Sequence, residues 1–313
     1  MTVYLKLKSL LRQGFFYEVI PLQTLEELHP VTILLYFSAI AGIAMFCMNP
    51  ILLLCSFTGA ILYFFILNKL KFFKRHFYSL LLFLILTLIN PFVSHNGVTV
   101  LFVLNDNPVT LESLLYGADS ALMILSVLYW LGLFSQIMTS EKILCIFGTF
   151  SPKIALFLSM TLRFVPLLNS QWKKVCDTQK TLGYFQSDNI IDGIKDYMHV
   201  FDIVLTWSLE NGIITANSMD ARGSGIGKRT SFSIHHFQKQ DFILIFIIIL
   251  LTGMIIFVIC QNALEINFYP AVSMTELNFS SIIGLSAYFL LALLPSVIQI
   301  EVSLKWKFLQ SKI

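Results

Sequence analysis

The sequence predicts an all-α membrane protein with about six transmembrane helices and a long stretch of cytoplasmic amphipathic helices. Hydrophobic residues make up 57% of the 313 residues and charged residues only 12%, whereas soluble proteins carry roughly 25% charged residues. The apolar residues gather in runs that are long enough to cross a hydrocarbon core of about 30 Å as helices. All 21 Lys and Arg residues fall on one side of the topology that these runs define.

Six apolar runs are predicted to cross the membrane, namely residues 31–48, 51–67, 77–93, 118–138, 242–260 and 282–300. Asn49 and Pro50 separate the first two runs. Proline does not continue a helix, and it biases the residue before it away from the helical conformation. The first two runs are therefore predicted to form a hairpin in the membrane.

The charges of the connectors alternate along the chain. Residues 68–76 are basic, whereas residues 94–112 carry only two acidic side chains. Residues 139–241 and the tail are basic again, whereas residues 261–278 carry only two acidic side chains. Since Lys and Arg are enriched in cytoplasmic loops, we predict a multi-pass protein of the cell membrane with both termini in the cytoplasm.

A seventh span at residues 154–168 is the alternative topology. This run is short, and Lys153, Arg163 and the pair Lys173-Lys174 would then crowd the membrane. The six-span topology keeps these basic side chains out of the membrane, and we therefore prefer it.

The predicted organisation has five segments. They are a cytoplasmic N-terminal segment (1–30), transmembrane helices 1–4 (31–138), a cytoplasmic helical region (139–240), transmembrane helices 5–6 (241–300) and a cytoplasmic tail (301–313). Residues 1–28 lack the apolar core of a cleavable signal peptide. The five Cys residues show no CxxC spacing, so neither a disulfide nor a metal site is predicted.

Two amphipathic helices are predicted in the cytoplasmic region. Apolar residues of the first recur at three- and four-residue steps; they are Leu168, Trp172, Val175, Cys176 and Leu182. The second follows Gly193 and ends at Arg222-Gly223, because Gly is the expected residue just beyond a helix terminus. Its apolar face holds Val200, Phe201, Val204, Leu205, Trp207 and Leu209. Such helices can serve merely as anchors in the membrane interface, but about a hundred residues exceed what anchoring requires.

The sequence carries no recognisable catalytic motif. The Gly-rich residues 222–230 do not form a P-loop, because Arg222 stands where the first Gly is required and Arg229 stands in place of Ser or Thr. The adjacent histidines, His235 and His236, are more typical of a solvated loop than of a metal site. The apolar runs contain no ionisable side chain near their centres, which a secondary transporter usually carries. We therefore expect a non-catalytic membrane scaffold without cofactor or metal, whose energy and substrate site come from other subunits.

The alternative is a membrane-interface enzyme or assembly factor. It would act on an anionic lipid through His235, His236, Asp241 and the neighbouring basic segment. Neither interpretation involves nucleic acid. Copurification separates the two, because a scaffold should bring down its partner subunits and an enzyme need not.

Three motifs follow one another between about His29-Pro30 and Thr230. The first is Asn90-Pro91-Phe92 with His95, Gly97, Thr99, Leu101 and Phe102, then Pro108-Val109-Thr110-Leu111-Glu112 and Tyr116-Gly117. The second is Leu162-Arg163-Phe164-Val165-Pro166 with Gln179 and Gly183, and the third is Ser218-Met219-Asp220-Ala221-Arg222-Gly223 with Lys228-Arg229-Thr230. In this order they resemble the signatures of the transmembrane T components of energy-coupling factor transporters.

The resemblance implies a membrane helix bundle with long cytoplasmic coupling helices. In that family, these helices sit on two ABC-type ATPase subunits and cradle a small substrate-binding membrane subunit. That subunit captures a vitamin or a transition-metal ion, and the complex works in the bacterial or archaeal cell membrane. The T component itself neither hydrolyses ATP nor selects the substrate.

The resemblance also assigns candidate residues. Those expected to couple to the ATPases are Gln179, Leu182, Gly183, Ala221, Arg222 and Gly223. Those expected to pack the coupling helices are Arg163, Pro166, Trp172, Val175, Val204 and Trp207.

One position departs from the family pattern. The first coupling helix usually ends in Gln-x-x-Arg-Gly, but this chain has Leu182 where the Arg is expected. We therefore expect the two helices to dock differently and the two ATPase subunits to be non-identical.

Overall fold

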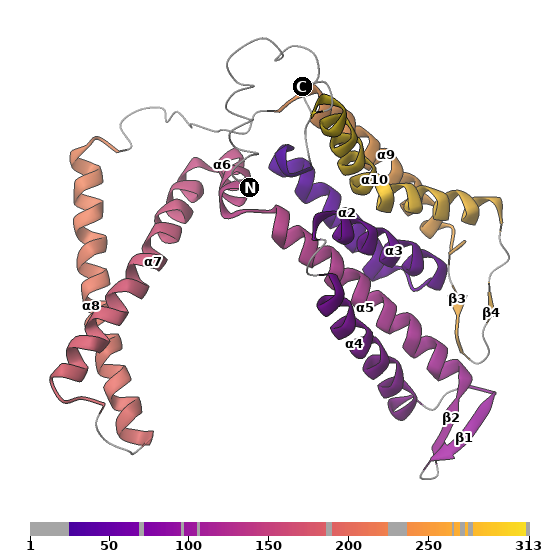
Figure 1. The fold of residues 1–313 in the computed structure, drawn as a ribbon, viewed down its shortest axis with the longest axis horizontal. Helices are drawn as coiled ribbons and strands as arrows, with labels where there is room; N and C mark the ends of the chain where they lie inside the picture. Colours follow the sequence, from indigo (N-terminus) through magenta and orange to yellow (C-terminus); the bar gives the residue numbers. More distant parts are fainter. Residues whose placement is uncertain are drawn as a thin grey trace. The chain divides into compact units, whose positions relative to one another are not determined.

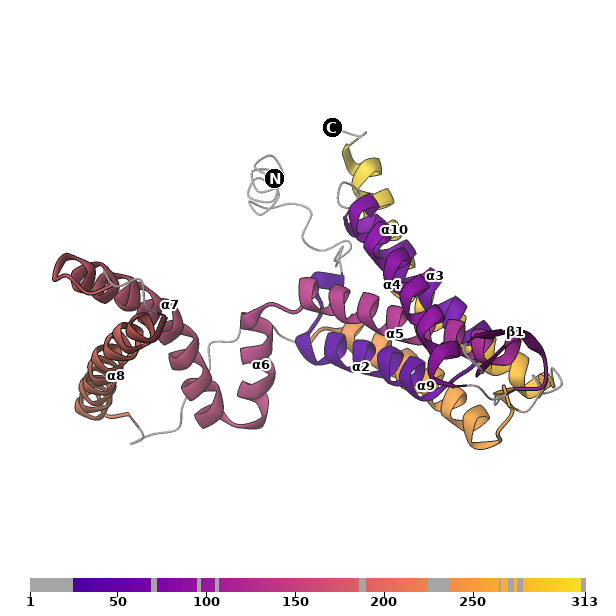
Figure 2. The same cartoon turned by 90° about the horizontal axis from the view of Figure 1, so that it is seen from below.

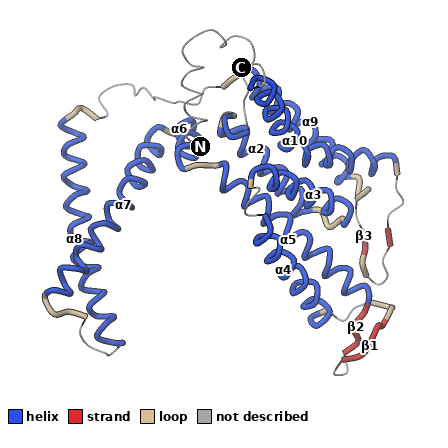
Figure 3. Tube along the Cα trace, viewed as in Figure 1, coloured by secondary structure: helices blue, strands red, loops and turns tan. Residues whose placement is uncertain are grey.

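The computed structural model describes residues 25–68, 72–94, 97–104, 107–185, 190–224, 237–264, 266–269, 273–274 and 278–310. These residues are helical almost throughout (Figure 3), which confirms the predicted all-α class. The chain divides into two compact units. The membrane unit comprises Met1–Thr139 and His235–Ile313, and the central unit comprises Ser140–Ile234.

The membrane unit contains six α-helices among its described residues (Figure 1). After the short 3₁₀-helix η1 (Leu25–Glu27) come α2 (Pro30–Phe46), α3 (Pro50–Leu67), α4 (Phe72–Val93), α5 (Leu111–Ile137), α9 (Lys239–Cys260) and α10 (Phe279–Gln310). Two short antiparallel hairpins, which the sequence did not predict, join α4 to α5 and α9 to α10. They are β1 (Val100–Leu104) with β2 (Asn107–Thr110), and β3 (Ile266–Asn267) with β4 (Ser273–Met274).

The central unit contains α6 (Ser140–Phe150), α7 (Pro152–Thr181) and α8 (Ile190–Ala221). α7 is one continuous helix that includes the apolar residues 154–168, and it begins at Pro152, since proline is favoured in the first turn of a helix. The expected start of the second amphipathic helix after Gly193 is wrong, because α8 begins at Ile190 and passes through that glycine. Its predicted end at Arg222-Gly223 is confirmed.

Among the described residues, six helices are long and apolar enough to cross a membrane, namely α3, α4 over His76–Val93, α5, α7, α9 and α10. The number agrees with the sequence prediction, but the set differs. The predicted first span, α2, is apolar but only 17 residues long, close to the lower limit for a span. α7 qualifies with the lowest mean hydropathy of the six, 1.2, and carries Lys153 and Arg163. The cytoplasmic location of α7 and the five segment boundaries stay predictions.

Buried polar contacts fix the centre of the membrane unit. α3 packs between α5 and α10 (Figure 1), and α9 packs on α10 and also on α2, along which it runs in Figure 2. The fully buried indole of Trp130 donates a hydrogen bond to the Ser56 hydroxyl at 3.0 Å, and the Tyr36 hydroxyl donates to the Leu291 carbonyl at 3.0 Å. Lipid tails are as apolar as the side chains, so helix association in a membrane relies on such contacts and on close packing.

The N-terminal ends of α2 and α9 are fastened together. The Asp241 carboxylate is 1% exposed and accepts hydrogen bonds from the backbone N–H groups of His29 and Gln238, each at 2.9 Å. The His29 ring stacks on Phe237 with centroids 3.6 Å apart. The alternative interpretation, an enzyme or assembly factor that acts on an anionic lipid, included Asp241 in its site. This carboxylate is buried and already accepts the hydrogen bonds that hold the starts of α2 and α9 together. The other residues of that site, His235 and His236, lie outside the described residues.

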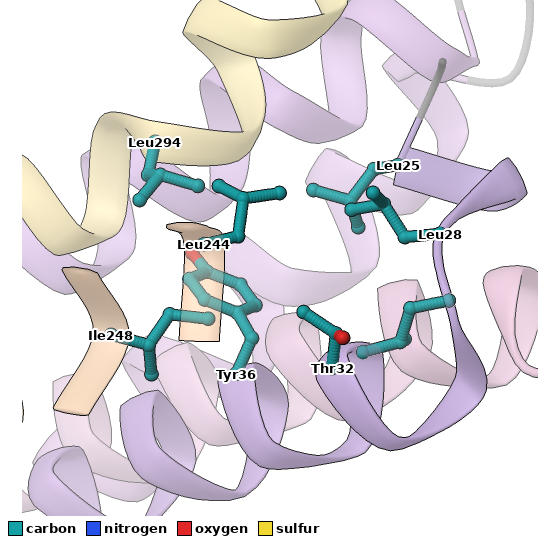
Figure 4. Close-up of a pocket in the computed structure, with 8 residues that line it drawn as sticks. Leu25, Leu28, Thr32, Tyr36, Leu244, Ile248 and Leu294 are labelled. Carbon is teal, nitrogen blue, oxygen red and sulfur yellow. The ribbon is translucent and has the colours of Figure 1, made fainter. Parts of the chain in front are cut away.

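A narrow apolar pocket lies between η1, α2, α9 and α10 (Figure 4). Its lining residues are Leu25, Leu28, Thr32, Ile33, Tyr36, Leu244, Ile248 and Leu294. The lining contains no Asp, Glu, His, Lys or Arg side chain, and the hydroxyl groups of Tyr36 and Thr32 already donate to the Leu291 carbonyl and to Asp241, so the pocket offers no charged group to a metal ion or an anion.

Replacing Gly59 by Ala should destabilise the membrane unit. The added Cβ would lie 2.8 Å from the Ala292 Cβ and 2.9 Å from the Ala292 carbonyl oxygen, so α3 and α10 would have to move apart. Overpacking of this kind costs about 1–3 kcal/mol. Gly253→Ala is the matched control, because nothing lies within 4 Å of the Cβ position there. Thermal unfolding of the purified chain in detergent measures the difference, and equal midpoints for the two variants would contradict the close contact.

Candidate functional site

The first motif closes the turn between α4 and α5. The Glu112 carboxylate, 3% exposed, accepts hydrogen bonds from the Thr99 hydroxyl at 2.7 Å and the Thr99 N–H at 3.2 Å. Gly97 has φ +138°, and a Cβ there would lie 2.6 Å from a Glu112 carboxylate oxygen. Gly117 similarly allows α5 to approach the Thr87 carbonyl of α4. These residues build the connection between the two helices, and His95 lies outside the described residues.

The second and third motifs belong to α7 and α8, which cross and pack on each other near the C-terminal part of α7 (Figure 1). Four buried residues form their shared core, namely Val175, Cys176, Val200 and Val204. Leu168, Trp172, Phe185 and Ile203 pack around them. The structure thus brings the candidate packing residues Trp172, Val175 and Val204 together.

Other candidate packing residues lie outside this core. Trp207 is half-buried, and Arg163 and Pro166 are exposed on α7. The expected apolar faces also included Leu182 and Leu209, but these side chains are 67% and 61% exposed.

The two packed helices carry opposite charge. α7 has the basic residues Lys153, Arg163, Lys173, Lys174 and Lys180 against the single acidic Asp177. α8 has the acidic residues Asp192, Asp196, Asp202, Glu210 and Asp220 against the single basic Lys195. Opposite charge favours the pairing of α7 with α8 over the pairing of two copies of either helix.

The C-terminal end of α7 is closed by a left-handed glycine. Gly183 has φ +94°, and the chain turns back so that the Tyr184 N–H donates to the Gln179 carbonyl at 3.1 Å. The Gly183 N–H donates to the Lys180 carbonyl at 3.2 Å. This is the Schellman arrangement, in which glycine is preferred because a Cβ strains the left-handed conformation.

The C-terminal end of α8 is closed in the same way. Gly223 has φ +75°, the Ser224 N–H donates to the Met219 carbonyl at 3.0 Å, and the Gly223 N–H donates to the Asp220 carbonyl at 2.9 Å. Arg222 is exposed, as is Ala221 before it. Leu182 and Arg222 therefore occupy equivalent positions, each the last residue before the left-handed glycine.

The α7 terminus has further contacts with α8. Phe185 also has a left-handed backbone, with φ +67°, and its N–H donates to the Asp196 carboxylate at 2.8 Å. Its ring meets Tyr197 edge to face at 4.9 Å, and Tyr184 stacks on His199 at 5.5 Å. The sequence did not predict these contacts with α8. Its one local signal was the aromatic pair Tyr184-Phe185 directly after Gly183, which could have indicated a fixed turn.

Gln179 lies beneath the α7 terminus. Its side chain is 9% exposed, and its Oε1 has no hydrogen-bond partner among the described residues, which omit 186–189. The Gln179 backbone carbonyl therefore takes part in the helix cap, and the Gln179 side chain is buried rather than exposed at the helix end.

A comparison with protein families decides the identification. The model of the cobalt transport protein family, CbiQ, matches residues 22–232, from before α2 to beyond α8. The chain belongs to this family. The resemblance to the transmembrane T components of energy-coupling factor transporters is thereby confirmed, and the family is one of multi-pass membrane proteins that transport solutes.

Several relatives carry the name energy-coupling factor transporter transmembrane protein EcfT. The protein of Lactobacillus helveticus is 32% identical over 117 residues, 37% of this chain and 42% of that protein. EcfT 1 of Listeria monocytogenes is 33% identical over 102 residues, 32% of this chain and 38% of that protein. EcfT of Streptococcus equi is 29% identical over 113 residues, 36% of this chain and 41% of that protein. The chain thus matches less than half the length of these relatives.

Replacing Gly183 or Gly223 by Ala should loosen the corresponding helix end. A Cβ in the left-handed conformation costs roughly 1–2 kcal/mol, so amide hydrogen exchange at residues 179–184 or 219–224 should accelerate about five- to thirtyfold. Gly212→Ala is the control in the interior of α8, where nothing lies within 4 Å of the Cβ position and Ala favours the helix. Unchanged exchange in the Gly183 and Gly223 variants would show that the left-handed conformation is not required.

Proposed function

We propose that this CbiQ-family chain is the coupling subunit of an energy-coupling factor importer. It holds two ABC-type ATPase subunits at the C-terminal ends of α7 and α8, and it transmits their ATP-driven motion to a small substrate-binding membrane subunit. The observation that carries this proposal is the pair of helix ends that share one backbone geometry, with Leu182 exposed at the tip of α7 and Arg222 exposed at the tip of α8.

The two ends are well separated, which suits two partner subunits. The α7 terminus contacts Asp196 near the start of α8, whereas Arg222 stands at the end of α8. At 1.5 Å per helical residue, roughly 40 Å of helix separates the two ends. Each end can therefore receive its own ATPase subunit, and α8 is a continuous rod between them.

Arg222 has the chemistry of a docking residue. Its guanidinium is a planar fork with five donors, which matches a carboxylate or a pair of carbonyl groups in two parallel hydrogen bonds. Gly223 ends the helix directly after it, so the fork stands at the tip and is exposed. The simpler interpretation is that Arg222 only offsets the helix dipole, which is worth about 0.3–1 kcal/mol.

In this proposal a partner subunit, and not this chain, selects the substrate of the complex. We propose that the complex imports a vitamin or a transition-metal ion, which the substrate-binding subunit selects, and that it works in a bacterial or archaeal cell membrane. Cobalt is the solute that the family description names. Both termini of this chain would then face the cytoplasm, where the ATPases bind ATP.

Replacing Arg222 by Ala should reduce uptake about 10- to 100-fold and weaken copurification of an ATPase subunit. A hydrogen bond to a charged group contributes about 1.5–3 kcal/mol, and Ala removes the whole fork. Arg222→Lys should retain part of the activity, because a single ammonium group replaces the fork. Uptake by cells that carry the whole complex and pull-down of its subunits are the measurements.

Lys174→Ala is the matched control for charge. Lys174 is exposed on α7 and lies two turns before the helix end, so its loss should leave uptake and assembly unchanged. Normal uptake together with an intact complex in the Arg222→Ala variant would contradict a docking role for Arg222.

A further inference from the structure

Pro295 interrupts the hydrogen-bond ladder of α10. Because proline has no backbone N–H, the Leu291 carbonyl four residues earlier receives no hydrogen bond from position 295. The Tyr36 hydroxyl of α2 donates to this carbonyl at 3.0 Å, and the Tyr36 side chain is only 2% exposed. Backbone polar groups at membrane depth need a partner within the protein. The hydroxyl therefore replaces the N–H that the proline lacks.

The two halves of α10 on either side of Pro295 are held differently. In the first half, Ala292 packs so closely on Gly59 of α3 that a Cβ added there would lie 2.9 Å from the Ala292 carbonyl oxygen. In the second half, Val302 is the only buried side chain among the described residues 297–308. The first half is thus fixed to a neighbouring helix, whereas most of the second half is exposed or half-buried.

The packing beside this proline is incomplete. Figure 4 shows the Tyr36 side chain extending from α2 toward α10, with Leu294 of α10 at the same narrow pocket. Directly after the proline, the Ser296 hydroxyl is buried and has no hydrogen-bond partner among the described residues. A turn with few satisfied contacts rearranges more easily than a fully packed one.

A second proline of the membrane unit lacks these features. Pro91 of α4 similarly leaves the Thr87 carbonyl without its usual donor. Gly117 of α5 packs against this oxygen, since a Cβ at Gly117 would lie 2.9 Å from it. Pro91 also stands in the last turn of α4, whereas residues 296–310 of α10 still follow Pro295. Of these two prolines, only Pro295 has a long helical segment beyond it.

We propose that Pro295 is a hinge in α10 and that the Tyr36 hydroxyl is the latch that keeps it closed. With the latch closed, residues 296–310, the arm, hold one direction relative to α2 and α3. When the hydroxyl leaves the Leu291 carbonyl, the arm swings while the first half of α10 stays packed on α3. Single hydrogen bonds between membrane helices are modest in strength, so the open state remains accessible.

This inference goes beyond the proposed coupling function and does not depend on it. The hinge, the latch and the arm all belong to this chain, so the purified chain alone can test them. α10 also lies beyond residues 22–232, which match the family.

Distances from α3 to the arm test the latch. Spin labels are placed at Leu62 of α3 and Leu304 of α10, which are both exposed, in the full chain in lipid nanodiscs. Labels carried by non-natural amino acids leave the native cysteines in place. The wild-type chain should give one narrow distance distribution. Tyr36→Phe removes only the hydroxyl and should broaden this distribution severalfold.

Pro295→Ala completes a double-mutant cycle. The new N–H at position 295 can serve the Leu291 carbonyl, which then no longer needs the hydroxyl. In this background the distribution should be narrow whether residue 36 is Tyr or Phe, and such non-additivity identifies the two residues as one unit. Broadening by Tyr36→Phe that persists in the Pro295→Ala background would overturn the latch. An unchanged distribution in the Tyr36→Phe single variant would overturn it as well.

A second pair of labels reports on the first half of α10. It joins Leu62 to Ile282, which is also exposed. This distribution should stay narrow in every variant, because the hinge lies beyond both positions. Broadening here after Tyr36→Phe would show that the hydroxyl holds the whole helix bundle rather than the arm, and would contradict the hinge.

Tyr288→Phe is the matched control for the loss of a buried hydroxyl. The Tyr288 hydroxyl also donates to a helix carbonyl, that of Ile40, at 3.4 Å. Position 44 is an alanine, so the Ile40 carbonyl keeps its donor within α2. Both distributions should therefore stay narrow in this variant. Broadening of the arm distribution as large as that in Tyr36→Phe would show that the proline does not make the Tyr36 contact special.

Discussion

The exposed C-terminal ends of α7 and α8 depend on two glycines with a left-handed backbone conformation, Gly183 and Gly223. A helix leaves its last carbonyl groups without partners. At Gly183 and Gly223 the chain reverses, and the N–H groups of Tyr184 and Ser224 reach back to those carbonyls. The reversal stops each helix at a defined residue. The side chain before each glycine is therefore held at the tip, which is what a docking contact requires.

The membrane unit is fixed by a different set of contacts. Close approach at Gly59 and the hydrogen bond from Trp130 to Ser56 lock its central helices, and Asp241 fastens the start of α9 to His29. These contacts substitute for the hydrophobic effect, which is weak between helices in lipid. The central unit has only a four-residue core between α7 and α8, among its described residues.

The sequence predicted the fold class and the helix end at Arg222-Gly223, because apolar run length, charge distribution and a terminal glycine are local signals. It also placed Val175 and Val204 each on the apolar face of its own helix, since the apolar residues of each helix follow the helical period, and the structure packs these two faces on each other. It missed the locked turn of Phe185 on Asp196, because that contact joins two helices. It predicted the start of α8 too late, because Gly193 was taken as a boundary although a helix tolerates a single glycine.

Membership of the CbiQ family supports a transport role, and the matched helix ends support coupling to two motor subunits. Because α8 is one continuous helix between these ends, ATP-driven motion must move α8 as a whole relative to the membrane unit. Spin labels at Asp220, near the end of α8, and at Lys307, on α10 of the membrane unit, measure this movement in the purified complex. We predict a distance distribution that shifts when ATP binds, returns after hydrolysis and stays constant in the isolated chain. A distribution that is unchanged by ATP in a complex that still hydrolyses it and transports would contradict the account.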